Sequence, residues 1–149
     1  MVRQATAVYW EQTMIRLKRE MGFVYDLVQS QLVPSTTSEE ALQVSLNLGP
    51  CQGRLLMVTA RPINAVQIAS RKQVTRGESL ESQISVTDNE SPIDAVIPIE
   101  VRIIDPEGSA AEYSGYYGAK GGRQSVRLEV APNDRPGVWT IMVRELASG

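Results

Sequence analysis

Aspartates are the residues of this 149-residue chain that are best suited to acid–base or metal chemistry. Glycoside hydrolysis by an acid pair requires two carboxyl groups roughly 5–10 Å apart across one cleft, one of them with a raised pKa. Four aspartates lie near turn-forming residues instead: Asp88, Asp94, Asp105 and Asp134. Aspartate is common there because its side chain accepts hydrogen bonds from nearby backbone amides. We predict turn chemistry for all four, and the sequence shows neither an acid pair nor the spacing of an EF-hand calcium site.

Two residue types restrict nucleophilic and metal chemistry further. The chain has no histidine, and Cys51 is its one cysteine. Ser–His and Cys–His nucleophile pairs, histidine-ligated zinc and multi-cysteine metal sites all need residues that are missing. An intramolecular disulfide is excluded for the same reason. We predict that the chain is not an enzyme, has no catalytic residue, and holds neither a metal nor a cofactor.

A group of tyrosines is the one aromatic cluster that suits a binding surface, because tyrosine offers a flat ring and a polar tip to sugars or proteins. The cluster comprises Tyr113, Tyr116 and Tyr117. In a strand, Tyr113 and Tyr117 point to one side and Tyr116 to the other. At least one tyrosine is then expected in the core, so a ligand or partner surface and plain core packing stay open as alternatives.

Charge and hydropathy narrow the range of partners. The 15 Lys and Arg residues and the 17 Asp and Glu residues give a formal net charge of −2, with both signs scattered along the chain. No basic run could neutralise a row of phosphates, so we expect no nucleic-acid partner. No stretch has the ~20 apolar residues needed to cross a bilayer, so we expect no membrane span. With 42% hydrophobic residues, the chain should fold around a packed core.

Residues 4–32 carry two competing patterns. Apolar residues recur at spacings of three and four, which is typical of an amphipathic helix. Gly22 interrupts this pattern, and residues 23–28 concentrate aromatic and β-branched side chains that suit a strand. We favour strands here, one over residues 13–18 and one or two within residues 23–33.

The following segment shows strands separated by loops. Residues 34–38 are rich in turn-forming residues and predict a loop. Residues 42–48 alternate apolar and polar side chains, which predicts a half-buried strand, although the Thr-x-x-Glu pattern at 37–40 could open a short helix as a capping box. Residues 55–59 predict a buried strand, and Pro62 marks a plausible boundary because proline cannot donate to a ladder.

After this boundary, strand patterns and turns follow one another at a regular rhythm, which predicts a β-sandwich of about seven strands. Asp105-Pro106-Glu107-Gly108 places proline and glycine where a type I turn favours them. Trp139 shares a strand face with Ile141 and Val143, so we expect its side chain to be buried between two sheets.

Three segments of the second half resemble the macroglobulin-like and bacterial Ig-like sandwich modules. They are residues 76–80, residues 101–108, and residues 131–141, which contain a Pro-Gly-Val-Trp-Thr element. The resemblance covers residues 63–149 and implies an Ig-like antiparallel β-sandwich there. The thioester motif of the protease-trapping macroglobulins is absent, so protease trapping is not implied.

Residues 1–62 look like part of the terminal β-domains of bacterial glycoside hydrolases. The resemblance is carried by residues 22–27, 42–46 and 53–58. It implies a small antiparallel β unit, a partial sandwich, in a chain that is a piece of a longer protein. The catalytic residues of those hydrolases lie in a separate domain, so no position here inherits their role.

The expected fold class is therefore all-β, with an Ig-like antiparallel β-sandwich preceded by a smaller antiparallel β unit. The resemblances imply a non-catalytic accessory or structural fragment of a larger, carbohydrate-active bacterial protein. Its partners are then the neighbouring domains of its own polypeptide, and its location is extracytoplasmic. The alternative is a free-standing adhesion module that binds carbohydrate or protein.

Overall fold

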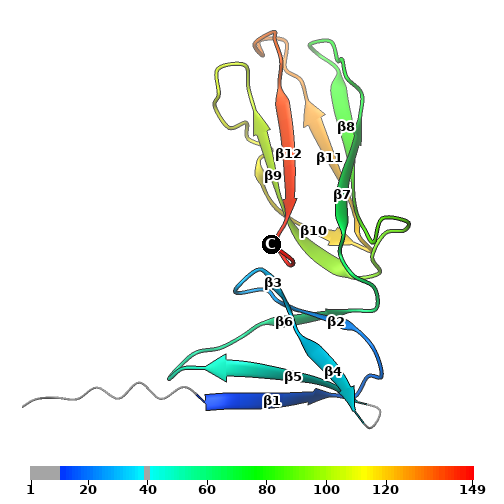
Figure 1. Cartoon of the computed structure of the whole chain (residues 1–149). Coiled ribbons are helices and arrows are strands. Elements are labelled where there is room, and N and C mark those ends of the chain that lie inside the picture. The colour runs from blue at the N-terminus through cyan, green and yellow to red at the C-terminus, as the bar shows by residue number, and fades with distance from the viewer. Residues whose placement is uncertain (1–10, 39–40) are drawn as a thin grey trace, which may run out of the picture.

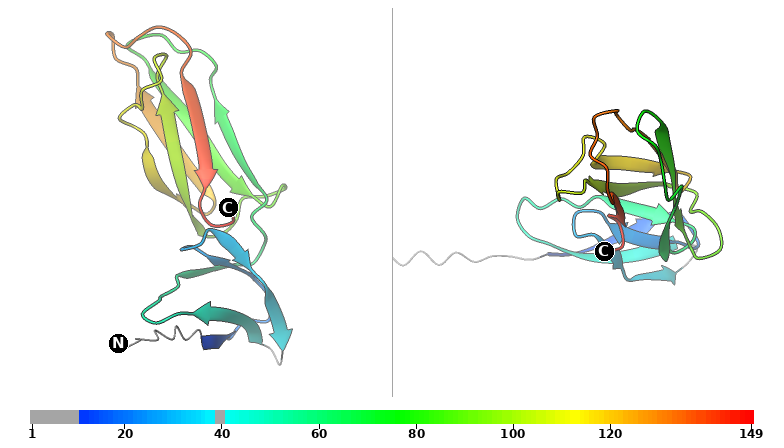
Figure 2. Two further views of the ribbon diagram at one scale, coloured as in Figure 1. Left: turned by 60° about the vertical axis from the view of Figure 1, so that its left-hand side comes forward. Right: turned by 90° about the horizontal axis from the view of Figure 1, so that it is seen from above.

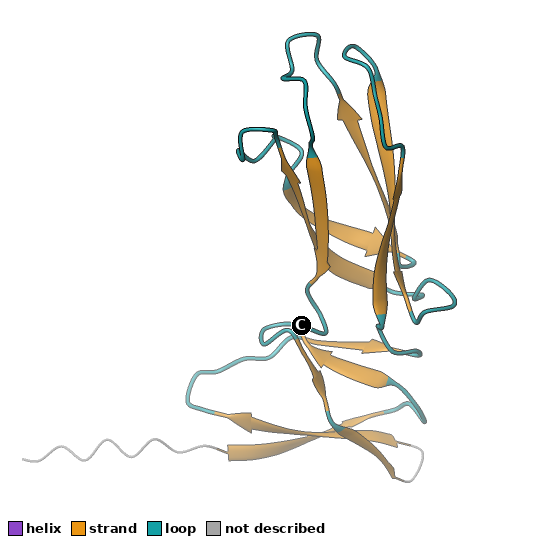
Figure 3. Ribbon diagram, turned by 45° about the horizontal axis from the view of Figure 1, so that its top comes forward, coloured by secondary structure: helices purple, strands orange, loops and turns teal. Residues whose placement is uncertain are grey.

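The computed structural model describes residues 11–38 and 41–149, and every regular element in these parts of the chain is a β-strand (Figures 1 and 3). The all-β prediction is confirmed, and the preference for strands over a helix holds for residues 11–32, while residues 4–10 lie outside the described residues. Within the described parts, no helix that could cross a membrane is found. The strands are β1 (Glu11–Leu17), β2 (Phe23–Asp26), β3 (Gln31–Val33), β4 (Ser35–Ser38), β5 (Ala41–Leu48), β6 (Leu56–Thr59), β7 (Ala65–Ser70), β8 (Ser79–Thr87), β9 (Val96–Ile104), β10 (Gly115–Lys120), β11 (Arg123–Glu129) and β12 (Thr140–Glu145).

Strands β1 to β6, the lower unit, form two three-stranded antiparallel sheets in the orders β1-β5-β4 and β3-β2-β6. The predicted alternation along β5 directs Leu42, Val44 and Leu46 to one side, where they are buried. Val24 of β2 and Val33 of β3 join them in one apolar cluster. The lower unit is therefore two sheets packed around a core of their own.

The loop expected at residues 34–38 is wrong, because Ser35–Ser38 is the strand β4 at the edge of its sheet. Its residues are all serine or threonine, a composition that also suits loops. An edge strand has one free side and tolerates such polar residues, and Pro34 stands before the strand, where it removes no ladder donor. Thr37 lies opposite Leu42 within this ladder and does not open a helix.

Strands β7 to β12, the upper unit, form one antiparallel sheet in the order β12-β9-β10-β11-β8-β7. Strands β10 and β11 share only the paired position Lys120 and Arg123, so the sheet bends sharply between them. Its two halves then face each other, and the edge strands β7 and β12 lie side by side (Figures 1 and 2). The six strands, against about seven expected, therefore surround one core as a single bent sheet. The core includes Ile84, Val86, Ile97, Ile99, Val101, Ile103, Ala119, Val126 and Leu128.

A joint around Tyr25 of β2 connects the two units. Alternation along β2 turns Val24 toward the lower core and Tyr25 toward the upper unit. Tyr25 is 1% exposed, and its hydroxyl accepts a hydrogen bond of 2.8 Å from the backbone N–H of Ile63. Ile93 and Ala147 of the upper unit belong to the same buried cluster. The predicted boundary falls in the connection between β6 and β7, and the Tyr25 side chain packs across it.

The last residues of the chain add to this joint. The buried Glu145 carboxylate accepts a hydrogen bond of 2.8 Å from the backbone N–H of Ala147, and the Ser148 hydroxyl also donates to it. A Cβ atom built on Gly149 would meet the backbone oxygen of Ser30, in the turn between β2 and β3. The end of β12 is therefore held against the lower unit.

Candidate functional site

Three of the four aspartates form the turns that the sequence predicts. Each carboxylate accepts hydrogen bonds of 2.7–3.0 Å from backbone N–H groups within four residues of it: Asp88, Asp105 and Asp134. Asp94 is exposed. Among the residues that the structure describes, no three His, Cys, Asp or Glu side chains gather as a metal-ligand set. The carboxylates therefore stabilise loops and do not converge on a common site.

Asp88 also takes part in an ion pair. Its Oδ2 lies 2.7 Å from Nη1 of Arg61, whose Nη2 donates to the carbonyl oxygen of Pro92 at 2.6 Å. The hydrogen bond from the Ser91 N–H is the largest cause that holds the pKa of Asp88 below its ordinary value of 3.8, and the Glu90 N–H and the Arg61 guanidinium lower it further, against partial burial. The pair fastens the connection between β6 and β7 to the loop that follows β8.

We expect Asp88 to make the stability of the fold depend on pH in the acid range. Because its pKa is lower in the folded state, its contribution is fully present above the ordinary value of 3.8 and is lost as the pH falls through the folded pKa. Asp88→Asn should therefore lower the free energy of unfolding at neutral pH, and the gap to the wild type should close toward about pH 2. Denaturant unfolding at a series of pH values measures this gap. A gap that stays constant or widens on acidification would contradict the expectation.

A buried carboxylate that the sequence analysis missed lies at the end of β2. Oδ1 of Asp26 accepts hydrogen bonds from the backbone N–H groups of Val28 at 2.9 Å and Gln29 at 3.2 Å. Its Oδ2 lies 3.0 Å from Nε of Arg54, and both side chains are largely withdrawn from water. Removing one partner would leave a buried charge uncompensated, so the pair holds the β2–β3 turn against the segment that leads into β6. The sequence feature that could have indicated this buried carboxylate is a single charged residue, Asp26, between two apolar neighbours.

The three tyrosines do not share one surface. Tyr116 is 76% exposed, whereas Tyr117 packs against the upper core. The Tyr117 hydroxyl donates to the carbonyl oxygen of Tyr113 at 2.7 Å, and the Tyr113 hydroxyl accepts from the backbone N–H of Glu129 at 3.3 Å. The predicted alternation of Tyr116 and Tyr117 is observed, but Tyr113 precedes the strand. A ligand role for the three residues stays a prediction.

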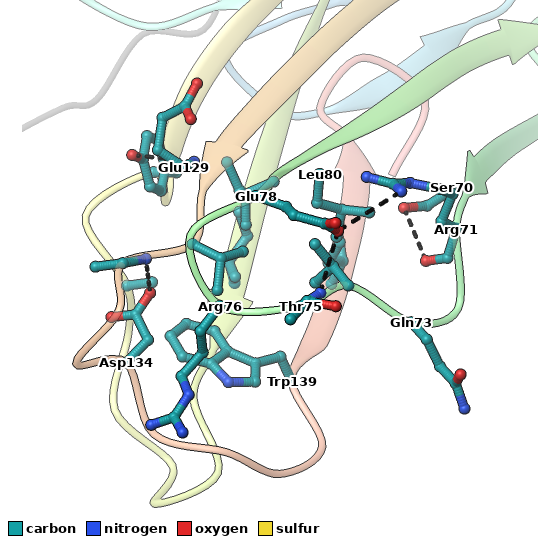
Figure 4. A pocket seen from close by; sticks show the side chains of 18 of the residues that line it. Ser70, Arg71, Gln73, Thr75, Arg76, Glu78, Leu80, Glu129, Asp134 and Trp139 are labelled. Carbon is teal, nitrogen blue, oxygen red and sulfur yellow. Dashed lines mark hydrogen bonds and ion pairs between the residues drawn. The ribbon is translucent and has the colours of Figure 1, made fainter.

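An open cleft of about 1460 Å³ lies at the end of the upper unit opposite the joint (Figure 4). It is bordered by the second half of β7, the first half of β12 and the loops that connect β7 to β8, β9 to β10, and β11 to β12. Leu80, Ile103 and Leu128 give it an apolar lining. The cleft has no signal in the sequence, because it forms between strands far apart in the chain.

Inward-facing residues in β7 and directly before β12 are only partly covered at the cleft. Ile68 of β7 lies opposite the buried Ile84 and so faces the core, yet it is 41% exposed. Trp139, expected to be buried, is half-buried instead; its Nε1 donates to the carbonyl oxygen of Arg135 at 3.1 Å. The expected full burial is wrong because alternation tells which way a side chain points and not whether a neighbouring strand covers it.

No protein-family model, curated protein or solved structure matches this chain. The functional inference therefore depends on the arrangement of the described residues.

Basic side chains flank the cleft beside the two edge strands. They come from the loop after β7 and the loop before β12: Arg71, Lys72, Arg76 and Arg135. Arg71 lies 4.0 Å from Glu78, and Arg135 pairs with Glu107. Lys72 and Arg76 have no ion-pair partner among the described residues. The lining also holds Glu78, Glu112, Glu129 and Asp134, so its acidic and basic side chains are equal in number. The two cations without an ion-pair partner both lie in the loop after β7.

Proposed function

We propose that this chain is a non-catalytic structural module that holds neighbouring domains of a larger protein at a fixed distance and orientation. The observation that carries the proposal is Tyr25, which belongs to the lower unit yet is buried in the cluster of the upper unit and bonded to Ile63. Units joined only by an exposed linker move relative to one another. A buried shared side chain opposes such motion, so rigid spacing is the property that this architecture supplies best.

The sequence resemblances support the same proposal. The upper unit resembles macroglobulin-like and bacterial Ig-like modules, and the lower unit resembles terminal β-domains of bacterial glycoside hydrolases. The parent is then a multidomain, carbohydrate-active bacterial protein outside the cytoplasm. The partners of the chain are the neighbouring domains of that polypeptide.

We expect the two units to keep one relative placement in solution. Cys51 is exposed in the lower unit, and Val138 is exposed at the cleft end of the upper unit, so Cys51 and Val138→Cys can carry a pair of spin labels. A pulsed electron-resonance measurement of the distance between the labels should give one narrow distribution, because the Tyr25 joint fixes the two ends.

A second pair of spin labels, both within the upper unit, serves as a reference. It gives the width of the distance distribution that is expected for labels on one rigid body. Asp94→Cys with Val138→Cys, in a chain that also carries Cys51→Ser, serves this purpose because both positions are exposed. A distribution between the units that is several times broader than this reference would reject the spacer function.

A binding module is the second candidate, and the open apolar cleft is the observation that favours it. Trp139 borders the cleft and could act as a stacking platform for a sugar ring. The same half-buried side chain also packs against the upper core. The two roles predict different effects of removing the indole ring: loss of stability for core packing, and loss of sugar binding for a stacking platform.

We expect Trp139→Ala to lower the free energy of unfolding by about 2 kcal/mol, roughly half the loss for a fully buried aromatic residue. Tyr116→Ala, at an exposed position of β10, is the control and should change stability by no more than about 0.5 kcal/mol. Denaturant unfolding of both variants measures this. Unchanged stability of Trp139→Ala, with loss of polysaccharide binding in affinity electrophoresis, would favour the sugar-binding function instead.

A further inference from the structure

The upper sheet has two free edges that border the same cleft. Strand β7 pairs with β8 and strand β12 pairs with β9, and within the described residues neither strand pairs with anything on its other side. A free edge presents a row of unpaired backbone N–H and C=O groups, which is a template for a further strand. The cleft therefore offers backbone hydrogen bonds as well as apolar surface.

Strand β7 lacks the features that usually prevent a free edge from pairing. Natural edge strands are commonly protected by proline, by charged side chains or by a covering loop. The sequence of β7 is Ala-Val-Gln-Ile-Ala-Ser, with no charge and no proline. The edge strand β4 of the lower unit is likewise uncharged, but its residues are all serine or threonine and offer no apolar side chain. The edge strands β3 and β6 are uncharged and free of proline too, but β7 is the one of these three that borders the cleft.

The apolar interior beside this edge is incomplete. Ile68 faces inward but is 41% exposed, and Trp139 across the cleft is half-buried. Met142, on the outer face of β12, is exposed to almost the same extent, 44%. An inward-facing residue as exposed as an outward-facing one indicates a place for apolar side chains from elsewhere.

The positive charges at the rim predict which residues a strand bound in the cleft would carry at one of its ends. Lys72 and Arg76 follow β7 in the chain and line the cleft at its open end. A strand that adds antiparallel to β7, the more stable arrangement per residue, begins at this end. Acidic residues at its amino-terminal end would therefore meet these two cations.

We propose that the cleft binds an extended peptide segment from a protein partner, added as an antiparallel strand to the free edge of β7. Every second side chain of the segment is apolar and enters the cleft beside Ile68 and Trp139. Acidic residues at its amino-terminal end lie beside Lys72 and Arg76. The interaction surface goes beyond the spacer function, since it would give the module a partner of its own.

A synthetic peptide of about six residues, long enough to cover the half of β7 that borders the cleft and to reach the loop after it, tests this proposal. The probe has two aspartates followed by alternating valine and threonine. We expect calorimetric titration to show saturable binding, and hydrogen exchange of the free-edge amides of β7 to slow in the complex. Two matched peptides should bind more weakly: one with its aspartates at the carboxyl end, and one N-methylated on the amides that face β7.

Two variants of the chain locate the site. Ile68→Asp should weaken peptide binding by about tenfold or more, because it places a charge where an apolar side chain must enter. Met142→Asp is the matched control, since it changes an equally exposed apolar residue on the outer face of the opposite edge strand, and it should leave binding unchanged. Lys72→Glu combined with Arg76→Glu should weaken binding by roughly two- to fivefold without touching the core.

Several results would overturn the proposal. One is the absence of binding at peptide concentrations up to about 1 mM. Others are equal binding by Ile68→Asp and Met142→Asp when both variants melt as folded proteins, or equal binding of the N-methylated peptide. Concentration-dependent self-association of the chain that is abolished by Ile68→Asp would assign the cleft to a second copy of the chain instead of a peptide partner.

Discussion

Gly122→Ala is expected to lower the free energy of unfolding by about 3–5 kcal/mol, the range in which a single substitution unfolds many domains of this size. Gly122 is buried in the turn between β10 and β11, with a φ of 67°. A Cβ atom there would lie 2.7 Å from the backbone nitrogen of Ile93 and 2.7 Å from the backbone oxygen of Val86. Those two atoms are themselves hydrogen-bonded at 3.0 Å, so neither can move away alone without breaking that bond.

The neighbouring glycine, Gly121, separates the steric clash of an added Cβ atom from the strain of a left-handed backbone conformation. Gly121 has a φ of 57°, and a Cβ atom there would meet nothing within 4 Å. Gly121→Ala should therefore lose only about 1–2 kcal/mol, the usual penalty for a left-handed conformation. Guanidinium unfolding of the two variants compares them directly. Equal losses would mean that the contacts around Gly122 relax and that conformation alone accounts for both.

Regular alternation made most of the upper unit predictable from the sequence. The stretch around Ile97, Ile99, Val101 and Ile103 has one apolar face, and all four side chains are buried in β9. Strand β4 was missed because serine and threonine are typical of loops as well as polar edge strands. The requirement for glycine at 122 was also hidden, since it depends on Val86 and Ile93, which approach only after folding.

The candidate site was predictable only in part. Turn chemistry for Asp88 and Asp105 follows from neighbouring residues, and it is observed. The cleft depends on β7 and β12, which are the first and last strands of the upper unit in the sequence. No local sequence pattern shows that these two strands lie near each other without pairing. The joint could not be predicted for a similar reason. Alternation along β2 shows that Val24 and Tyr25 face opposite ways, but it does not show what covers each face.

Tyr25→Ala is expected to remove about 3–5 kcal/mol of stability, the usual loss for truncating a buried aromatic residue. It should also separate the unfolding of the two units, because Tyr25 supplies both ring contacts and the hydrogen bond to Ile63 at the joint. Calorimetry should show one cooperative transition for the wild type and two for this variant. Tyr25→Phe keeps the ring and leaves the Ile63 N–H unpaired, so it should lose about 1–3 kcal/mol and keep one transition.

Val24→Ala is the control that makes this result specific to the joint. Val24 precedes Tyr25 on the same strand and is fully buried, but it faces the lower core. Its truncation creates a smaller cavity in one unit only, so the melting temperature should fall while the contacts of Tyr25 with the upper unit persist. If Val24→Ala splits the transition as readily as Tyr25→Ala, stability of the lower unit governs the coupling. If neither variant splits it, the coupling depends on other joint contacts, such as those of Ile93 and Ala147.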